Sequence, residues 1–315
     1  MTNIDNYKGV ILVLLDLSAA FDTIDHGVLL RLMESRLGIT GTVLNWFQSY
    51  LTNRTQKVSV GKSLSSLYHL LCGVPQGSVL GPILFTIYIL PMGDIARRHG
   101  ITFHIYADDT QIYCSFDLSD SDNTKSRIEN CIADIRLWMI SQKLKLNDDK
   151  TEIIILSAPS HTTQVNCGNI VIGDSCVVPA ASARNLGVIF DHHLTMESHI
   201  KMVSKNAYYH LRNIASIRNT LCVDSAKALV HAFISSRLDY CNSLLYGLPK
   251  KSLDRLQRVQ NMAARLITGT KITDHITPVL HGLHWLPINQ RTVFKFCSSK
   301  QCLRIICIVV IRLHK

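Results

Sequence analysis

The sequence predicts an α+β fold followed by an all-helical region, and three observations support this. Strand-like and helix-like patterns alternate over the first two hundred residues, whereas the apolar spacing becomes wholly helical from about residue 195. The charge balance changes at the same place. Residues 1–200 carry 15 Lys and Arg against 19 Asp and Glu (−4), and residues 201–315 carry 18 against 4 (+14). We expect one antiparallel sheet with packed helices, followed by a basic helical domain.

The first part is expected to open with a buried strand and two helices. Residues 9–15 form the continuous apolar run GVILVLL, which is typical of a strand buried on both faces. Residues 27–38 have helical apolar spacing and end in a glycine, and a second helix is expected near 41–51. A strand pair follows, TQKVSV and SSLYHLLCG, with its turn at Gly61-Lys62.

The rest of the first part alternates between helix and strand. The stretch VPQGSVLGPILFTIYI leads from a Pro- and Gly-rich loop into an apolar helix near 80–93. A hairpin is expected at 101–114, and a helix with one apolar face near 123–142. The segments LKLNDDKTEIIIL and RNLGVIFD each supply one further strand.

Three helices are expected in the second part: MESHIKMVSKNAYYHLRNIASI, VDSAKALVHAFISSRLDYCNSLLYG and KSLDRLQRVQNMAARLITG. Asp224 or Ser225 caps the second helix and Gly247 closes it, while Ser252 caps the third. Three arginines of the third helix lie away from its apolar face: Arg255, Arg258 and Arg265.

The composition indicates a soluble, intracellular protein. The chain is 47% hydrophobic and 18% charged, as expected for a soluble protein with a core. Its ten cysteines are scattered, which favours reduced thiols over a disulfide frame or a zinc site. The apolar runs Val10–Leu15 and Ile305–Ile311 are too short for a signal peptide or a membrane span. We expect no membrane association, and the sequence does not choose between nucleus and cytoplasm.

Three carboxylates are candidates for a metal site. Asp16 ends the buried strand, and Asp108 and Asp109 lie at the tip of the expected hairpin. If these strands are neighbours, the carboxylates converge, and they can remain ionised together only if a cation neutralises them. Oxygen ligands favour Mg²⁺, and two such ions stabilise the oxygens of a phosphoryl transfer. The alternative is that the three are separate surface charges in solvated turns, as expected for the nearby Asp22 and Asp25.

The basic second part indicates a polyanionic partner, with nucleic acid as the leading candidate. The alternative is a solvated helical surface without a partner.

Five motifs occur in the order of the consecutive palm motifs of reverse transcriptases. They are VLLDLSAAFDTIDH, GVPQGSVLGPILFTIYI, YADDTQIY, LKLNDDKTEIIIL and NLGVIFD. They most resemble the non-LTR (LINE-type) retrotransposon group. The later stretches SRLDYCNSLLYGLPKKSLDRLQRVQNMAARLITG and HITPVLHGLHWLPINQR resemble the region downstream of the palm in that group. The resemblance covers about residues 9–295.

The resemblance implies an RNA-directed DNA polymerase that works by two-metal-ion nucleotidyl transfer. It implies that Asp16, Asp108 and Asp109 bind two Mg²⁺ ions, with Mn²⁺ as a possible substitute, and that Lys150 protonates the leaving pyrophosphate. A solvated lysine is the alternative for Lys150. The partners implied are an RNA template, a DNA primer and deoxynucleoside triphosphates, with protein partners unknown.

The resemblance also assigns residues that position the nucleotide and the primer. Phe21 matches the bulky residue that selects deoxynucleotides, although a packed core aromatic is the alternative. The loop that cradles the template base and the nucleotide corresponds to Pro75, Gln76, Gly77 and Ser78, for which a plain loop before a helix is the alternative. Leu186 and Gly187 match the primer grip. The arginines Arg255, Arg258 and Arg265 would contact the nucleic-acid backbone.

The implied domains are a palm at 1–195, a thumb-like basic region at 196–295 and a divergent tail at 296–315 that is either unstructured or unrelated to the family. Only fifteen residues precede Asp16, so the family's fingers region is expected to be largely missing and the chain to be truncated before the first palm motif. Two functions therefore stay open. One is an active reverse transcriptase, and the other is an inactive remnant that only binds RNA or an RNA–DNA hybrid.

Overall fold

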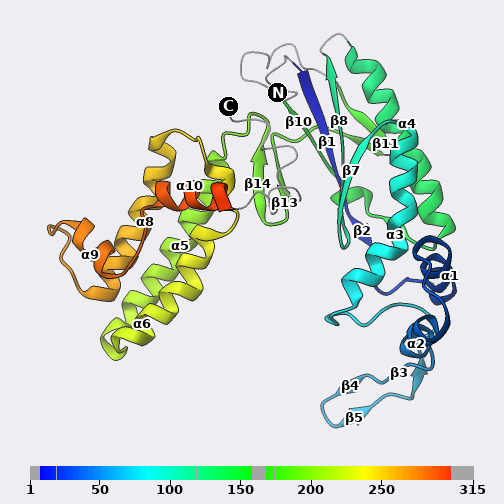
Figure 1. Ribbon diagram of the computed structural model, residues 1–315, viewed down its shortest axis with the longest axis horizontal. Coiled ribbons are helices and arrows are strands. Elements are labelled where there is room, and N and C mark those ends of the chain that lie inside the picture. Colours follow the sequence, from blue (N-terminus) through cyan, green and yellow to red (C-terminus); the bar gives the residue numbers. More distant parts are fainter. Residues whose placement is uncertain (1–7, 19, 118–119, 158–167, 174, 299–315) are drawn as a thin grey trace. The chain divides into compact units, whose positions relative to one another are not determined.

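A computed structural model describes residues 8–18, 20–117, 120–157, 168–173 and 175–298 (Figure 1). The chain divides into two compact units. The sheet unit holds the described residues between 8 and 155 and between 168 and 180. The helical unit holds residues 156–157 and 181–298. The predicted α+β fold class is confirmed, since an antiparallel sheet with packed helices precedes an all-helical region.

A four-stranded sheet forms the centre of the sheet unit. Its strand order is β10 (Glu152–Leu156), β1 (Lys8–Leu15), β8 (Asp109–Asp117) and β7 (Thr102–Tyr106). β8 pairs antiparallel with both β1 and β7. The β1–β8 register runs from the Lys8–Asp117 pair to the Leu15–Thr110 pair. The ends of β1 and of the β7–β8 hairpin therefore meet at one edge of the sheet.

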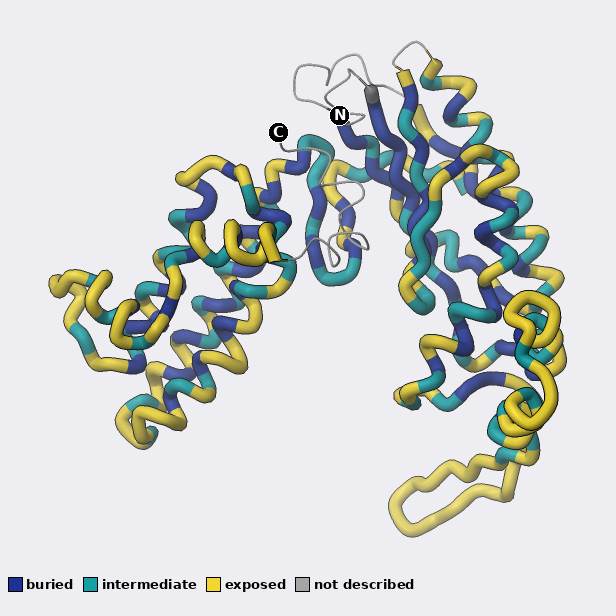
Figure 2. The backbone as a smooth tube through the Cα atoms, viewed as in Figure 1, coloured by how far each residue is buried: buried dark blue, intermediate teal, exposed yellow. Residues whose placement is uncertain are grey.

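Helices cover one face of this sheet (Figure 1). They are α3 (Gly81–Arg98) and α4 (Ser121–Ser141), while α1 (His26–Leu37) packs on α3 and on α2 (Gly41–Leu51). Alternate residues of β1, such as Ile11 and Val13, pack with fully buried side chains of α3 and α4 such as Phe85 and Ile132. Burial of these apolar side chains provides the main stabilisation of the unit, and the buried positions follow β1 and the inner sides of the helices (Figure 2).

Several short strands complete the sheet unit. An exposed arm is built from β3 (Thr55–Gln56) paired with β6 (Tyr68–His69) and from β4 (Ser59–Val60) paired with β5 (Ser63–Leu64). Its turn lies at Gly61-Lys62, as predicted. β2 (Leu17–Ser18) pairs with β9 (Lys145–Leu146), which precedes the short 3₁₀ turn η2 (Asp148–Lys150). β11 (Ile170–Ile172) pairs with β12 (Ser175–Val177).

The helical unit begins with the hairpin of β13 (Ser182–Asn185) and β14 (Val188–Asp191). The long helices α5 (Glu197–Ile217) and α8 (Lys250–Thr268) pack together. The remaining elements are η4 (Arg218–Thr220), α6 (Val223–Val230), the π-helical turn η5 (His231–Ser235), α7 (Ser236–Asp239), η6 (Asn242–Leu245), α9 (Ile276–Gly282) and α10 (Ile288–Ser298). None of the helices in the described parts of the chain is long and apolar enough to cross a membrane.

Four local predictions in this unit are wrong. RNLGVIFD forms a hairpin and not one strand, because Leu186 and Gly187 both have positive φ angles, 45° and 82°, and reverse the chain. The helix predicted to close at Gly247 ends at Asp239. Neither Asp224 nor Ser225 is its cap, since the Cys222 thiol accepts the Ser225 N–H. Ser252 lies inside α8, whose N-cap is Pro249.

The two ends of the second part also differ from the sequence pattern. The hairpin at 182–191 groups with the helical unit, although the change of pattern placed the boundary near 195. The reason is local, because α5 packs on β14 and the Ile189 N–H donates to His199 Nδ1 at 3.5 Å. α10 extends to Ser298, so residues 296–298 of the predicted unstructured tail are helical, and residues 299–315 lie outside the described chain.

Candidate active site

The first carboxylate of the site, Asp16, follows β1 directly and is held from a second segment. Its Oδ2 accepts a hydrogen bond from Asn147 Nδ2 at 3.0 Å, and its backbone oxygen accepts one from the Asn147 N–H at 2.9 Å. Lys150 Nζ lies 3.8 Å from the same carboxylate. The β2–β9 pairing brings Asn147 and Lys150 here, because Leu17 pairs with Leu146 immediately before them.

The second and third carboxylates lie at the turn of the β7–β8 hairpin. Tyr106 pairs with Asp109, so the connection consists of Ala107 and Asp108 only. Asp109 is thus the first residue of β8, and the prediction that both aspartates occupy the tip is right only for Asp108. Ala107 has a φ of 53°, a left-handed conformation that is unfavourable by about 1–2 kcal/mol for a residue with a Cβ. Strained backbone of this kind is concentrated at functional sites.

The three carboxylates interact electrostatically. Burial raises the pKa of Asp109 above its usual range, and the negative charges of Asp108 and Asp16 raise it further. The strand register explains this proximity. Leu15 pairs with Thr110, and in antiparallel strands the residue after Leu15, which is Asp16, lies beside the residue before Thr110, which is Asp109. The structure therefore brings Asp16, Asp108 and Asp109 together at one edge of the sheet.

These residues have the donor chemistry of a hard divalent cation, because carboxylates that repel each other are stabilised by a cation between them. Within the described residues, however, no three His, Cys, Asp or Glu side chains are grouped in a way that could hold a metal ion. The carboxylate oxygens are the ligand type that Mg²⁺ prefers, but in its described part the structure shows two carboxylates acting on Asp109 and not an assembled metal-binding group.

The turn that carries Lys150 is fixed to α4. Asp148 forms an ion pair with Arg136 of α4, with an N–O distance of 2.8 Å. Lys150 itself is largely exposed, so its attraction to Asp16 is weakened by solvent.

Asn147, which contacts Asp16 twice, is a residue that sequence reasoning missed. The signal for it was present in LKLNDDK, where a polar amide follows a short strand and precedes an Asp-Asp turn.

Phe21 and the loop Pro75–Ser78 are connected through the backbone. The Val74 N–H donates to the Phe21 carbonyl at 2.8 Å, which places the start of the loop beside Phe21. The Phe21 ring is half-buried and packs against Phe85, with 5.2 Å between ring centroids. It therefore has a packing contact in addition to any role toward a ligand.

Within the loop itself, Ser78 has a structural role and the two residues before it are open. The Ser78 hydroxyl donates to the Pro75 carbonyl at 2.7 Å and accepts the Gly81 N–H at 3.0 Å, which starts α3. Gln76 and Gly77 are exposed. Gly77 has a φ of 78° and no atom within 4 Å of a Cβ built on it, so a ligand can approach its backbone closely.

Leu186 and Gly187 form the turn of the β13–β14 hairpin in the helical unit. The Tyr240 hydroxyl, from the end of α7, donates to the Leu186 carbonyl at 2.6 Å and anchors this turn. A Cβ at Gly187 would lie 3.4 Å from the Tyr240 ring, so the turn packs closely on α7.

The three arginines of α8 differ in how their guanidinium groups are used. Arg255 forms an ion pair with Glu197 at 3.6 Å. Arg265 donates to the carbonyls of the segment after α8, those of Lys271, Ile272 and Asp274. Arg258 is exposed and makes one long bond, 3.3 Å, to a carbonyl of its own helix. Arg258 thus has the most donor capacity left for a phosphate.

Comparisons with known proteins place the chain in a family. Residues 2–190 match the family described as reverse transcriptase (RNA-dependent DNA polymerase). The chain is 25% identical over 268 residues to a probable RNA-directed DNA polymerase from transposon X-element of Drosophila melanogaster, covering 81% of this chain and 28% of that protein. It is 24% identical over 268 residues, with the same coverage, to the RNA-directed DNA polymerase from mobile element jockey of Drosophila funebris. The chain thus spans about 28% of the length of these relatives.

Among solved structures, apo telomerase from Candida tropicalis is similar with a TM-score of 0.45 and 12% identity. That likeness covers 92% of this chain and 47% of the telomerase chain. At this score and identity it does not establish a common fold.

Proposed function

This chain belongs to the reverse transcriptase (RNA-dependent DNA polymerase) family, and from that premise we propose that it synthesises DNA on an RNA template for a non-LTR (LINE-type) retrotransposon. The observation that carries the proposal is the group of interacting carboxylates Asp16, Asp108 and Asp109, with Lys150 beside them. In the reaction, the primer 3′-hydroxyl loses its proton to solvent, and its oxygen forms a bond to the α-phosphorus of a deoxynucleoside triphosphate. The bond from that phosphorus to the bridging oxygen breaks, and pyrophosphate leaves.

The residues of the sheet edge have separate roles in this proposal. Asp16, Asp108 and Asp109 would hold two Mg²⁺ ions, for which Mn²⁺ could substitute. When bound, such ions stabilise negative charge on the attacking and leaving oxygens. Asn147 fixes Oδ2 of Asp16 and so orients the carboxylate. Lys150 donates the proton that the leaving pyrophosphate takes up.

The surrounding loops position the substrates. Phe21 would exclude a ribose 2′-hydroxyl, and the exposed backbone at Gln76 and Gly77 would contact the template base and the nucleotide. Leu186 and Gly187 would position the primer end. The basic helical unit would bind the backbone of the RNA template and the DNA primer, mainly through Arg258, since Arg255 and Arg265 already have protein partners.

Primer extension on an RNA template tests the proposal. The wild-type chain is expected to extend a DNA primer with Mg²⁺ or Mn²⁺. Asp108→Asn is expected to lower the rate by at least about a hundredfold, because it removes one of the negative charges that would hold the metal ions at the reacting phosphate. Asp94→Asn is the matched control, since Asp94 is a half-buried carboxylate on α3 that pairs with Arg36 and Arg97 and is not part of the site.

The second function, binding without catalysis, is favoured by the basic helical region alone. Binding of an RNA–DNA hybrid together with no extension by the wild-type chain in either metal would contradict the polymerase proposal and support this alternative.

A further inference from the structure

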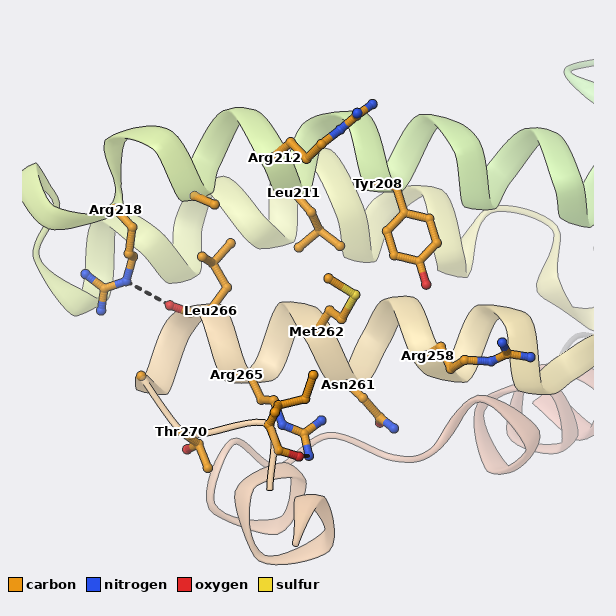
Figure 3. A pocket seen from close by; sticks show the side chains of 13 residues that line it. Tyr208, Leu211, Arg212, Arg218, Arg258, Asn261, Met262, Arg265, Leu266 and Thr270 are labelled. Carbon is orange, nitrogen blue, oxygen red and sulfur yellow. Dashed lines mark hydrogen bonds between the residues drawn. The ribbon is translucent and has the colours of Figure 1, made fainter. Parts of the chain in front are cut away.

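A cavity of about 660 Å³ lies in the helical unit between α5, α8 and the segment that follows α8 (Figure 3). Tyr208 and Leu211 of α5 point toward Met262 and Leu266 of α8, and these side chains form an apolar floor. The volume lies within the range of small-ligand sites in proteins. The residues proposed for the polymerase reaction in the sheet unit do not line it.

Two arginines give the cavity fixed walls. Arg218 donates to the carbonyls of Leu266 and Ile267 at 2.8 and 2.9 Å, which ties the end of α5 to the end of α8. Arg265 donates to carbonyls of residues 271, 272 and 274 and so ties the segment after α8, which contributes Thr270 and Ile272 to the lining, to the helix. Because both guanidinium groups serve backbone carbonyls, the walls are formed before any ligand binds.

The charge of the lining is entirely positive. Four arginines line the cavity and no aspartate or glutamate does. Arg212 and Arg258 are exposed, and neither has a carboxylate partner among the described residues. The apolar floor is accessible, since Met262 is 48% exposed. An accessible apolar floor surrounded by positive charge complements a ligand that has a flat apolar body and a phosphate.

We propose that this cavity holds an unpaired base of a single nucleic-acid strand, with the adjacent phosphates on Arg212 and Arg258. Tyr208 offers a ring face and Met262 a flexible apolar contact on which any base can stack. A duplex cannot use the recess, because its bases are stacked inside the helix, whereas a single strand can turn a base outward. The inference rests on the proposed function only in taking nucleic acid as the polyanion.

The experiment measures binding by fluorescence anisotropy with the full chain in EDTA, so that polymerisation plays no part. The probes are a labelled 15-nucleotide single-stranded RNA and the same RNA paired with DNA. Tyr208→Ala is expected to weaken binding of the single strand by about tenfold and of the duplex by less than about twofold, since one stacking contact is lost. Tyr208→Phe is expected to bind like wild type, because stacking needs the ring and not the hydroxyl.

Two further comparisons separate stacking from folding and from charge. Tyr209→Ala is the matched control, since Tyr209 is the next residue on α5, is 55% exposed and does not line the cavity. Met262→Glu is expected to weaken single-strand binding at least as much as Tyr208→Ala, and Met262→Gln much less. These two variants keep the test valid if Tyr208→Ala fails to fold.

Equal losses for single strand and duplex in Tyr208→Ala and Met262→Glu would overturn the proposal, as would no loss for either. Unchanged RNA binding together with Tyr208-dependent binding of an acidic amphipathic helical peptide would assign the cavity to a protein partner instead. Failure of primer extension by the wild-type chain would leave this inference standing, because the binding comparison is made without catalysis.

Discussion

At the scale of single residues, Asn147 contributes to the proposed chemistry only through another residue, Asp16. It touches Asp16 with its amide and with its backbone N–H, and it touches no substrate in the proposed reaction. Groups that orient a metal-binding carboxylate commonly change metal affinity or activity by ten- to a hundredfold when removed. Asn147 is therefore a positioning residue.

We expect Asn147→Ala to lower kcat of primer extension by about tenfold and to raise the Mg²⁺ concentration needed for half-maximal rate. Affinity for the primer–template should stay unchanged, because in the proposed function the helical unit would provide it. Asn123→Ala, at an exposed asparagine on α4, is the control. A change in primer–template affinity with kcat intact would show that Asn147 has a different role.

His199 carries a second residue-scale prediction, on pH. It is buried on α5, and burial lowers its pKa to about 4. The unfolded chain has the ordinary value of about 6.5 and binds the proton first. The free energy of unfolding should therefore fall as the pH drops from about 6.5 toward 4, by about 2 kcal/mol between pH 7 and pH 5.

Urea unfolding at the two pH values measures this effect. His199→Gln should reduce the pH dependence by about 2 kcal/mol. The part due to His104 and His210, whose pKa values burial also lowers, should remain. His281→Gln, at an exposed histidine, should leave the pH dependence intact. Equal pH dependence in the wild-type chain and His199→Gln would contradict the assignment.

At the scale of elements, the β13–β14 turn depends on two specific contributions. Gly187→Ala places a Cβ at a φ of 82° and close to the Tyr240 ring, which should cost about 1–2 kcal/mol. Tyr240→Phe removes the hydrogen bond to the Leu186 carbonyl and should cost about 1 kcal/mol. Both variants should lose amide-exchange protection in β13 and β14, and Tyr209→Phe should not. Unchanged protection in Gly187→Ala would mean that the turn is not strained.

Most elements of the sheet unit were predictable, because apolar runs and helical spacing identified β1, α1, α2, α4 and the β7–β8 hairpin. The failures come from interactions that spacing does not encode. The helix after Cys222 passes through a π-helical turn at His231–Ser235 and ends at Asp239, well before the glycine that was taken as its end. Likewise, a thiol replaced the expected hydroxyl or carboxylate as N-cap of α6.

In the candidate site, too, some features were predictable from the sequence and others were not. The effect of Asp16 and Asp108 on Asp109 agrees with the convergence expected from the order of strands, but no group of three that could hold a metal ion forms among the residues that the structure describes. Asn147 was missed because its hydrogen bonds depend on the two-residue pairing of β2 with β9, which has no periodic signal. The helical pattern also could not predict that Arg265 donates hydrogen bonds to three carbonyls. The pattern shows only the side of α8 on which Arg265 lies.

At the scale of the whole molecule, the charge is distributed unevenly along the chain, −4 over residues 1–200 and +14 over residues 201–315. Binding through the basic part should therefore weaken steeply with salt. We expect Arg258→Ala to reduce the slope of log affinity against log salt by about one, in titrations with an RNA–DNA duplex. Lys227→Ala, at a lysine paired with Asp224, is the control. A slope unchanged by Arg258→Ala would exclude a phosphate contact there.

The most direct test of the central claim is the rate at which a single deoxynucleotide is added to a primer on an RNA template. We expect the wild-type rate to rise with Mg²⁺ to a plateau. We expect Asp16→Asn to have a rate at least about a hundredfold lower at every Mg²⁺ concentration, with unchanged primer–template affinity in EDTA. Equal rates for the two chains, or no addition by the wild-type chain in Mg²⁺ and Mn²⁺, would contradict that claim.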